Sequence, residues 1–138
     1  MYKSILVTLD TTPTDRAIIE HIKQLAKEQH SSVVLLHVAT GVPAQFHGAT
    51  AAGKEVDEDR AYLEKIAAEL EAAGVPTKAE LGFGDPVTEI VKWIEERGCD
   101  LVAMGTHGHG LLADMFFGTT AHRVQHSISV PVLLLRSR

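Results

Sequence analysis

The chain has 138 residues, of which 45% are apolar, and it carries 13 Lys and Arg against 18 Asp and Glu, a formal net charge of -5. This length suits a single domain, which we expect over residues 1–138. The negative charge argues against a general electrostatic grip on nucleic acid or an anionic membrane. Cys99 is the only cysteine, so an intrachain disulfide is excluded and a reducing, cytoplasmic setting is favoured. The opening MYKSILVTLD is too short for a signal peptide, and no tract is long enough to span a membrane.

Apolar runs rich in branched residues alternate with segments of helical period, the pattern of parallel strands joined by crossover helices. The segments SILVTL (4–9) and SVVLLHV (32–38) are predicted as the first two strands. Between them, Thr12, Pro13 and Asp15 predict a helix start, with an N-cap, an N1 proline and an acidic N3 residue. Residues 39–53 contain no Asp, Glu, Lys or Arg and predict a loop.

The second half of the chain continues the alternation. Pro76 places the third strand at a sheet edge, because proline cannot donate to a neighbouring strand. The remaining predicted elements, in chain order, are a helix ending at Gly74, a strand at 75–81, a helix capped by Asp85 and Pro86 and ending at Gly98, a strand at 100–104, a helix from Thr119 to about Ser127 and a strand at 130–135.

Five strands and four helices in this order predict an α/β fold, an open doubly wound five-stranded parallel sheet with strand order 3-2-1-4-5 and helices on both faces. This is a Rossmann-like arrangement, like that of the adenine nucleotide alpha hydrolases. Ligands of such sheets lie beyond the carboxyl ends of the strands, where the winding direction reverses. Asp10, Val38 and Gly105 leave those ends, so we expect the functional site there.

A glycine-rich segment follows the fourth strand. Its GTHGHG (105–110) reverses the dinucleotide fingerprint, and the chain has no Gly-Lys-Ser/Thr triplet of a Walker A loop. The spacing is G-x2-G-x9-G-T, and it ends at the predicted start of the last helix. Glycines and hydroxyls at a helix N-terminus suit a phosphate, because backbone amides approach it unhindered. The spacing alone fits simple turns equally well.

This spacing, with Asp10 ending the first strand and His37 and Val38 ending the second, resembles the universal stress protein family in its ATP-binding branch. The resemblance runs along the whole chain, in YKSILVTLD, GDP, DLVAMGTHG, GTTAHRV and SVPVLLL. After Asp10 the chain departs from the family pattern, because DTTPTD replaces the small Gly-Ser often seen there.

The resemblance implies a role for each matching position. Asp10 would contact the adenosine, with Thr8 nearby, and the Val38 backbone would read the adenine edge. Met104 and Gly105 would border the ribose. The residues that would hold the phosphates, with a divalent cation such as Mg²⁺ bridging their oxygens, are Gly108, Gly118, Thr119 and Thr120.

The leading functional hypothesis is therefore an ATP-binding regulatory protein of the stress response, whose nucleotide occupancy sets its conformation or its choice of protein partner. We expect no dedicated enzyme and at most slow ATP hydrolysis, because no carboxylate or lysine is positioned as in known phosphoryl-transfer sites. Two alternatives stay open. One is a flavodoxin-like FMN carrier that uses the hydroxyl-rich TLDTTPT, and the other is a dimeric interaction module without nucleotide.

The last strand, between Val130 and Leu135, is short and apolar and is expected at an exposed sheet edge. Pairing with a second copy would cover this edge, and the resemblance implies such a homodimer. His107 and His109 are expected to add polarity to the glycine-rich segment. His122 and His126 lie four residues apart but lack an evident third ligand, which favours a solvated helix face over a metal site. The apolar residues 111–117 are expected either to anchor this segment or to form a surface that a partner reads.

Overall fold

The computed structural model describes residues 1–39, 50–105, 123–124 and 126–136, with the backbone alone for 50–55. Its strands form one parallel sheet in the order β3-β2-β1-β4-β5, as predicted. The elements in chain order are β1 (Ser4–Thr8), α1 (Asp15–Gln29), β2 (Ser32–Ala39), α3 (Thr50–Ala72), β3 (Thr77–Phe83), α4 (Pro86–Arg97), β4 (Leu101–Gly105) and β5 (Val132–Leu135).

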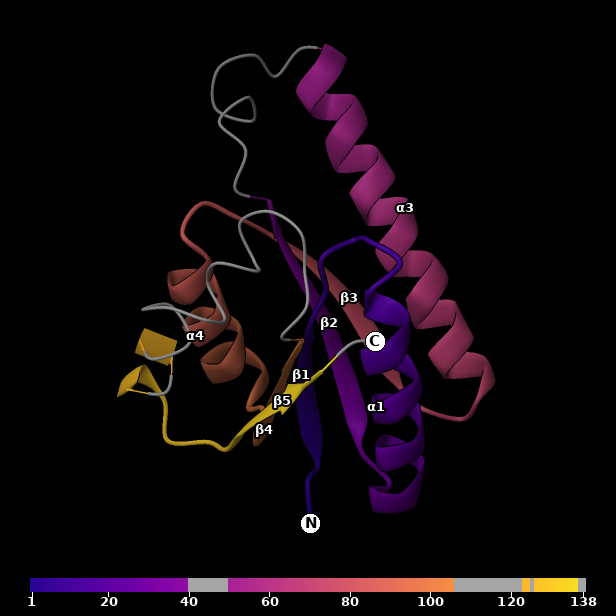
Figure 1. The fold of residues 1–138 in the computed structure, drawn as a ribbon, viewed down its shortest axis with the longest axis vertical. Helices are drawn as coiled ribbons and strands as arrows, with labels where there is room; N and C mark the ends of the chain where they lie inside the picture. The colour runs from indigo at the N-terminus through magenta and orange to yellow at the C-terminus, as the bar shows by residue number, and fades with distance from the viewer. Residues whose placement is uncertain (40–49, 106–122, 125, 137–138) are drawn as a thin grey trace.

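Helices cover both faces of the sheet, with α1 and α3 on one side and α4 on the other (Figure 1). Successive side chains of a strand point to opposite faces, so each central strand contributes to two cores. Ile5 and Val7 of β1 pack in the core beneath α1 and α3, whereas Leu6 packs in the core beneath α4. The continuous apolar runs of the sequence are therefore buried on both faces.

The helices bury the stripes that their periodicity predicts. Ile18 and Ile22 of α1 are buried, as are Ile90 and Ile94 of α4. Asp85 is the N-cap of α4, and its carboxylate accepts the backbone N–H of Thr88 at 3.0 Å. This bond satisfies one of the free amides of the first helical turn, as the sequence predicts.

Several predicted boundaries are wrong. β1 ends at Thr8 instead of residue 9, and β4 spans Leu101–Gly105 instead of 100–104. Ala39 is the last residue of β2 and α3 begins at Thr50, so the expected loop over 39–53 is too long at both ends. The start of α3 includes two alanines, the residues with the highest helix propensity. β3 begins at Thr77, because the Val75 N–H still bonds the Leu70 carbonyl at the end of α3. β5 begins at Val132, after Pro131, whose carbonyl accepts the Val102 N–H at 3.0 Å.

The predicted start of α1 is also wrong. The helix begins at Asp15 instead of Thr12, and its N-cap residue Thr14 makes no side-chain capping bond. The Asp15 carboxylate, expected to cap the helix, turns back instead to the residues that follow β1. The first helical turn therefore supports the end of β1.

The predicted last helix is only partly within the described residues, where residues 123–124 and 126–127 are helical. Among the helices that the structure describes, none is long and apolar enough to cross a membrane.

Candidate functional site

The candidate site lies at the carboxyl ends of three neighbouring strands, β2, β1 and β4. The chain leaves β1 toward β2 and later returns on the other side of β1 to form β4, so the direction of winding reverses at this point. Open α/β sheets bind ligands at such a reversal because the connections diverge and leave a crevice. The predicted residues Thr8, Val38, Met104 and Gly105 all lie at this edge, and Asp10 follows two residues after Thr8.

Thr8 ends β1 with a polar group that the fold leaves unsatisfied. Its side chain is 7% exposed, and its Oγ1 has no hydrogen-bond partner among the described residues. A buried hydroxyl without a partner costs about 1 to 3 kcal/mol. A buried hydroxyl of this kind, at the carboxyl ends of the strands, fits a binding site in which the ligand supplies the hydrogen-bond partner.

Asp10 lies just beyond this hydroxyl, where its carboxylate is poorly solvated. Burial, together with the neighbouring Asp15 carboxylate, raises its pKa from 3.8 to about 7. The ionised form is disfavoured because both causes penalise negative charge. A carboxyl with a pKa this far from its ordinary value, at the crevice of an α/β sheet, is typical of a binding site.

Asp15 is the residue that organises the backbone around Asp10. Its side chain is buried, and its Oδ1 accepts the Asp10 N–H at 2.8 Å while its Oδ2 accepts the Thr11 N–H at 2.8 Å. The Tyr62 hydroxyl, on α3, donates to the same Oδ2 at 2.8 Å. Burial and this hydrogen bond raise the pKa of Tyr62, so its phenol stays protonated and remains a donor.

Thr11 takes a backbone conformation that is rare for its residue type. Its φ is 62°, in the left-handed region that a β-branched side chain strongly disfavours. Such a conformation costs about 1 to 3 kcal/mol and persists only where the surroundings enforce it. The Thr11 Oγ1 donates to the Asp10 carbonyl at 2.5 Å, and the Asp15 carboxylate holds the Thr11 amide.

The end of β2 presents a backbone donor and acceptor toward β1. Leu36 faces β1, because its carbonyl accepts the Leu9 N–H at 2.9 Å, and the alternation of a parallel strand turns Val38 to the same side. At Val38 the β1 partner is missing, since β1 ends at Thr8 and the Leu9 carbonyl accepts from Nδ1 of His37 at 2.8 Å. The N–H and C=O of Val38 therefore point at the crevice.

Since a carbonyl can only accept, the Nδ1 of His37 carries a proton. Its Nε2 lies 3.5 Å from Oδ2 of Asp59 on α3. His37 thereby contacts the residue that follows β1 and a side chain of α3.

The end of β4 carries the two predicted ribose contacts. The side chain of Met104 is fully buried in the core beneath α4, so only its backbone can border a ligand. A Cβ added to Gly105 would meet no described atom within 4 Å, so packing within the described fold does not require a glycine there.

The residues predicted to bind the phosphates, called the phosphate cradle below, lie outside the described residues. They are Gly108, Gly118, Thr119 and Thr120. The histidines at 107, 109 and 122 and the apolar segment 111–117 also lie outside the described residues. Among the described residues, no group of three His, Cys, Asp or Glu side chains could hold a metal ion.

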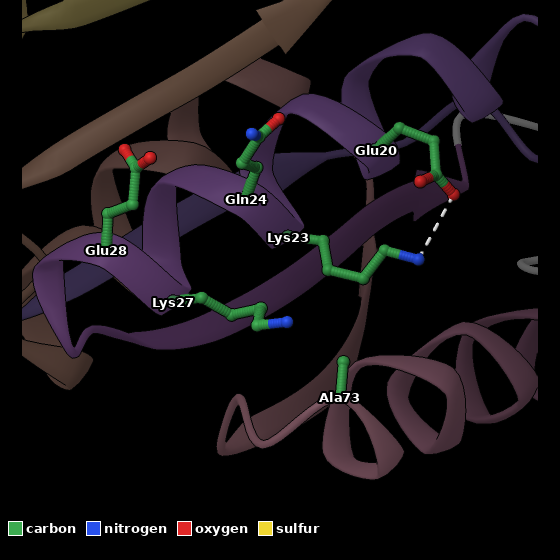
Figure 2. Close-up of a pocket in the computed structure, with 6 residues that line it drawn as sticks. All are labelled: Glu20, Lys23, Gln24, Lys27, Glu28 and Ala73. Atoms are coloured by element: carbon green, nitrogen blue, oxygen red, sulfur yellow. Dashed lines mark ion pairs between the residues drawn. The ribbon is translucent and has the colours of Figure 1, made fainter.

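A surface groove lies elsewhere, between α1 and the residue that follows α3. Its lining consists of Glu20, Lys23, Gln24, Lys27, Glu28 and Ala73 (Figure 2). Glu20 and Lys23 pair with each other across 3.2 Å, and Lys23 also pairs with Glu69 at 3.2 Å. Because these charges neutralise one another on an open surface, the groove offers little to a ligand, and it lies on the outer side of α1, away from the strand ends.

Sequence reasoning missed the supporting residues of the site. It assigned Asp15 to a helix cap, counted Thr11 only within the hydroxyl-rich TLDTTPT of the FMN alternative, and gave Tyr62 and Asp59 no role in the site. The one available signal was the departure from Gly-Ser after Asp10, which marks the position where Thr11 now takes a positive φ.

Comparisons with known proteins identify the family of the chain. The model of the universal stress protein family matches residues 1–136. The chain belongs to this family. Universal stress protein MJ0577 of Methanocaldococcus jannaschii is 28% identical over 157 residues, which cover 100% of this chain and 97% of the relative. A universal stress protein of Methanothermobacter thermautotrophicus is 31% identical over 147 residues, which cover 99% and 97%.

Solved structures of the family share the fold. The structure of MJ0577 has a TM-score of 0.82 at 30% identity and covers 100% of this chain and 98% of its own. A universal stress protein solved in complex with cAMP has a TM-score of 0.73 at 20% identity, with 99% of both chains covered. One from Archaeoglobus fulgidus, solved in complex with dAMP, has a TM-score of 0.70 at 18% identity and covers 96% and 97%.

Proposed function

We propose that this universal stress protein binds an adenine nucleotide, ATP foremost, at the carboxyl ends of β1, β2 and β4, and that nucleotide occupancy sets its conformation or its choice of partner in the stress response. The observation that carries the proposal is the set of polar groups that the fold leaves open at one edge. They are the buried Thr8 hydroxyl, the poorly solvated Asp10 carboxyl and the backbone of Val38.

These groups match the chemistry of adenosine. Adenine presents an amino donor next to ring-nitrogen acceptors, and the C=O and N–H of Val38 supply the complementary pair. The ribose hydroxyls can donate to the Asp10 carboxylate, and no described atom lies within 4 Å of a Cβ added to Gly105, the predicted border of the sugar. The predicted phosphate cradle of glycines and threonines would bind the phosphates, and a Mg²⁺ ion there would neutralise part of their charge.

Two relatives solved with cAMP and dAMP favour the adenine nucleoside as the shared recognition element. The energetics are compatible with micromolar affinity, which needs about -8 kcal/mol. Hydrogen bonds to charged groups contribute about 1.5 to 3 kcal/mol each, so a few phosphate contacts plus adenine burial can reach this value after the losses of association.

Release of bound nucleotide tests the proposal directly. The purified protein is denatured and the supernatant is separated by chromatography, and the melting temperature of protein stripped of nucleotide is then measured with and without Mg-ATP. We expect ATP or ADP in the supernatant, or an increase in melting temperature with Mg-ATP. Released FMN would instead identify a flavin carrier, and neither nucleotide nor thermal shift would identify an interaction module without nucleotide.

We also propose a homodimer through β5, within a cytoplasmic protein. β5 is an outer strand of the sheet, its four residues are all apolar, and Leu134 is 40% exposed. An apolar strand at the outer position of a sheet favours pairing with a strand of a second copy. Light scattering at micromolar concentration should give the mass of a dimer for the wild type and of a monomer for Leu134→Lys, and a monomeric wild type would contradict the proposal.

A further inference from the structure

The turn after β1 depends on support from outside itself. Asp10 is followed by Thr11, whose positive φ is unfavourable for a β-branched residue. Among the described residues, the hydroxyl of Thr11 bonds only the adjacent Asp10 carbonyl, a contact that does not tie the turn to another element of the fold. Some other group must keep this conformation populated.

Asp15 supplies that support through both of its oxygens. One oxygen accepts the Asp10 N–H and the other accepts the Thr11 N–H, each at 2.8 Å. A residue that only caps its own helix would direct its side chain at the amides of the first turn. The Asp15 carboxylate instead bonds two amides that precede the helix, one of which belongs to the predicted nucleotide contact Asp10.

The orientation of Asp15 is fixed in turn by α3. The Tyr62 hydroxyl donates to the oxygen that holds Thr11, at 2.8 Å and across 47 positions of sequence. Three residues earlier on α3, Asp59 reaches the His37 ring that bonds the Leu9 carbonyl. Residues three apart lie on one helix face, so a single face of α3 contacts Asp15 at the start of α1 and His37 near the end of β2.

We infer that Asp15 and Tyr62 form a positioning pair, which holds the Asp10–Thr11 turn in the conformation that binds nucleotide and makes α3 part of the support of the site. This inference rests on the proposed function. Neither residue contacts the nucleotide in this account, and both act through the backbone of the turn. The pair therefore sets affinity by determining how much of the protein has the turn preformed.

The size of the effect follows from preorganisation. When only a fraction of the protein holds the competent turn, the apparent dissociation constant rises by the inverse of that fraction. Removing the Tyr62 hydroxyl leaves its ring packed against the core beneath α1 and α3, so the fold is retained while the Asp15 carboxylate loses one of its three donors. We expect the competent fraction to fall to about one tenth, which is a tenfold weaker affinity.

The experiment measures the Kd of Mg-ATP by titration calorimetry for the wild type, Tyr62→Phe, Asp15→Asn and the double variant, with the melting temperature of each. Tyr2→Phe is the matched control, because Tyr2 packs partly buried against the same core but lies at the amino end of β1. We expect about tenfold weaker binding for each single variant and for the double variant, since partners in one network are not additive. Tyr2→Phe should bind like the wild type.

A rescue separates positioning from general stabilisation. Glycine adopts a positive φ without steric cost, so Thr11→Gly should restore affinity in the Tyr62→Phe background to within about threefold of the wild type. This arm also decides the outcome if Asp15→Asn fails to fold.

Wild-type affinity in Tyr62→Phe, or a Tyr62→Phe loss that Thr11→Gly leaves unchanged, would overturn the positioning role alone. A wild type that binds no adenine nucleotide would overturn the proposed function and the positioning role together.

Discussion

The two ends of the sheet shift the pKa of a carboxyl group in opposite directions. Asp100 directly precedes β4, and its carboxylate accepts the backbone N–H groups of Lys3 at 2.9 Å and Ser4 at 3.0 Å. Burial alone would raise the pKa of Asp100, but these backbone bonds outweigh it and hold the pKa below its usual value. Asp10 lies two residues beyond the end of β1, receives no such bonds within the described part of the chain, and has a pKa raised to about 7.

This difference in pKa distinguishes a carboxylate that stabilises the fold from one that is available to bind a ligand. At the amino end, Asp100 ties the start of β1 to the start of β4, so its charge is already stabilised by the fold. At the carboxyl end, the Thr8 hydroxyl has no partner among the described residues, Asp10 is poorly solvated, and Thr11 has a strained conformation. A fold retains such costs where a binding partner offsets them.

The largest effect is expected at the predicted phosphate cradle, in residues outside the described part of the chain. Gly118→Val should weaken Mg-ATP binding by about 100-fold or more, because a side chain would fill the approach to the phosphates and remove several charged hydrogen bonds at once. Titration calorimetry measures the affinity and a thermal melt checks the fold. Unchanged affinity in a folded variant would refute the phosphate role of this glycine.

Asp10→Ala should weaken Mg-ATP binding by about 30-fold, since one hydrogen bond to a charged group contributes about 1.5 to 3 kcal/mol. The same variant should not lose stability, because the removed carboxylate is disfavoured in the fold. Calorimetry and chemical denaturation measure the two quantities. Lower stability with intact affinity would show that Asp10, like Asp100, stabilises the fold and does not bind the nucleotide.

Asp100→Ala should show the converse behaviour. Its removal leaves the amides of Lys3 and Ser4 without their acceptor, and the free energy of unfolding should fall by about 1.5 kcal/mol. Mg-ATP affinity should match that of the wild type, because Asp100 lies at the opposite end of the sheet. A loss of affinity in this variant, measured on protein that is still folded, would break the distinction between the two ends.

The smallest effect concerns pH. The unfolded chain releases the Asp10 proton near its ordinary pKa of 3.8 and the folded chain near pH 7, so the folded state binds more protons between these values. This group therefore lowers stability as pH rises from about 4 to about 7. Asp10→Asn should remove that contribution and be more stable than the wild type by about 1 kcal/mol at pH 8, after allowance for partial solvent exposure, and equal to it at pH 4.

Denaturation curves of the wild type and Asp10→Asn at the two pH values measure this difference. A constant difference across the range would show that Asp10 titrates normally in the folded protein.

The sequence predicted the parts of the molecule that depend on periodic burial. Local patterns predict the buried faces of α1 and α4, which include Ile18 and Ile90, and the end of α4 at Gly98. The rules of parallel sheets predict the strand order. The position of the candidate site at this edge followed from the same topology, since Asp10, Val38 and Gly105 lie at or just beyond the carboxyl ends of neighbouring strands.

The supporting contacts of the site were not predictable in this way. Tyr62 and Asp15 are 47 residues apart in the sequence. The spacing of apolar residues in α3 does not indicate that the Tyr62 hydroxyl donates a hydrogen bond to a distant residue. The sequence around Asp15 fits a helix cap as well as it fits a support for the preceding turn. Only the three-dimensional arrangement distinguishes these two uses of the same carboxylate.

The most direct test of the account is a titration of ¹⁵N-labelled protein with Mg-ATP, followed through the backbone amide signals. The account predicts shifts concentrated at Asp10, Thr11, Val38 and Gly105, with the amides of Lys3 and Ser4 unmoved. No shifts at saturating Mg-ATP, or shifts centred on the amino end of the sheet, would contradict it.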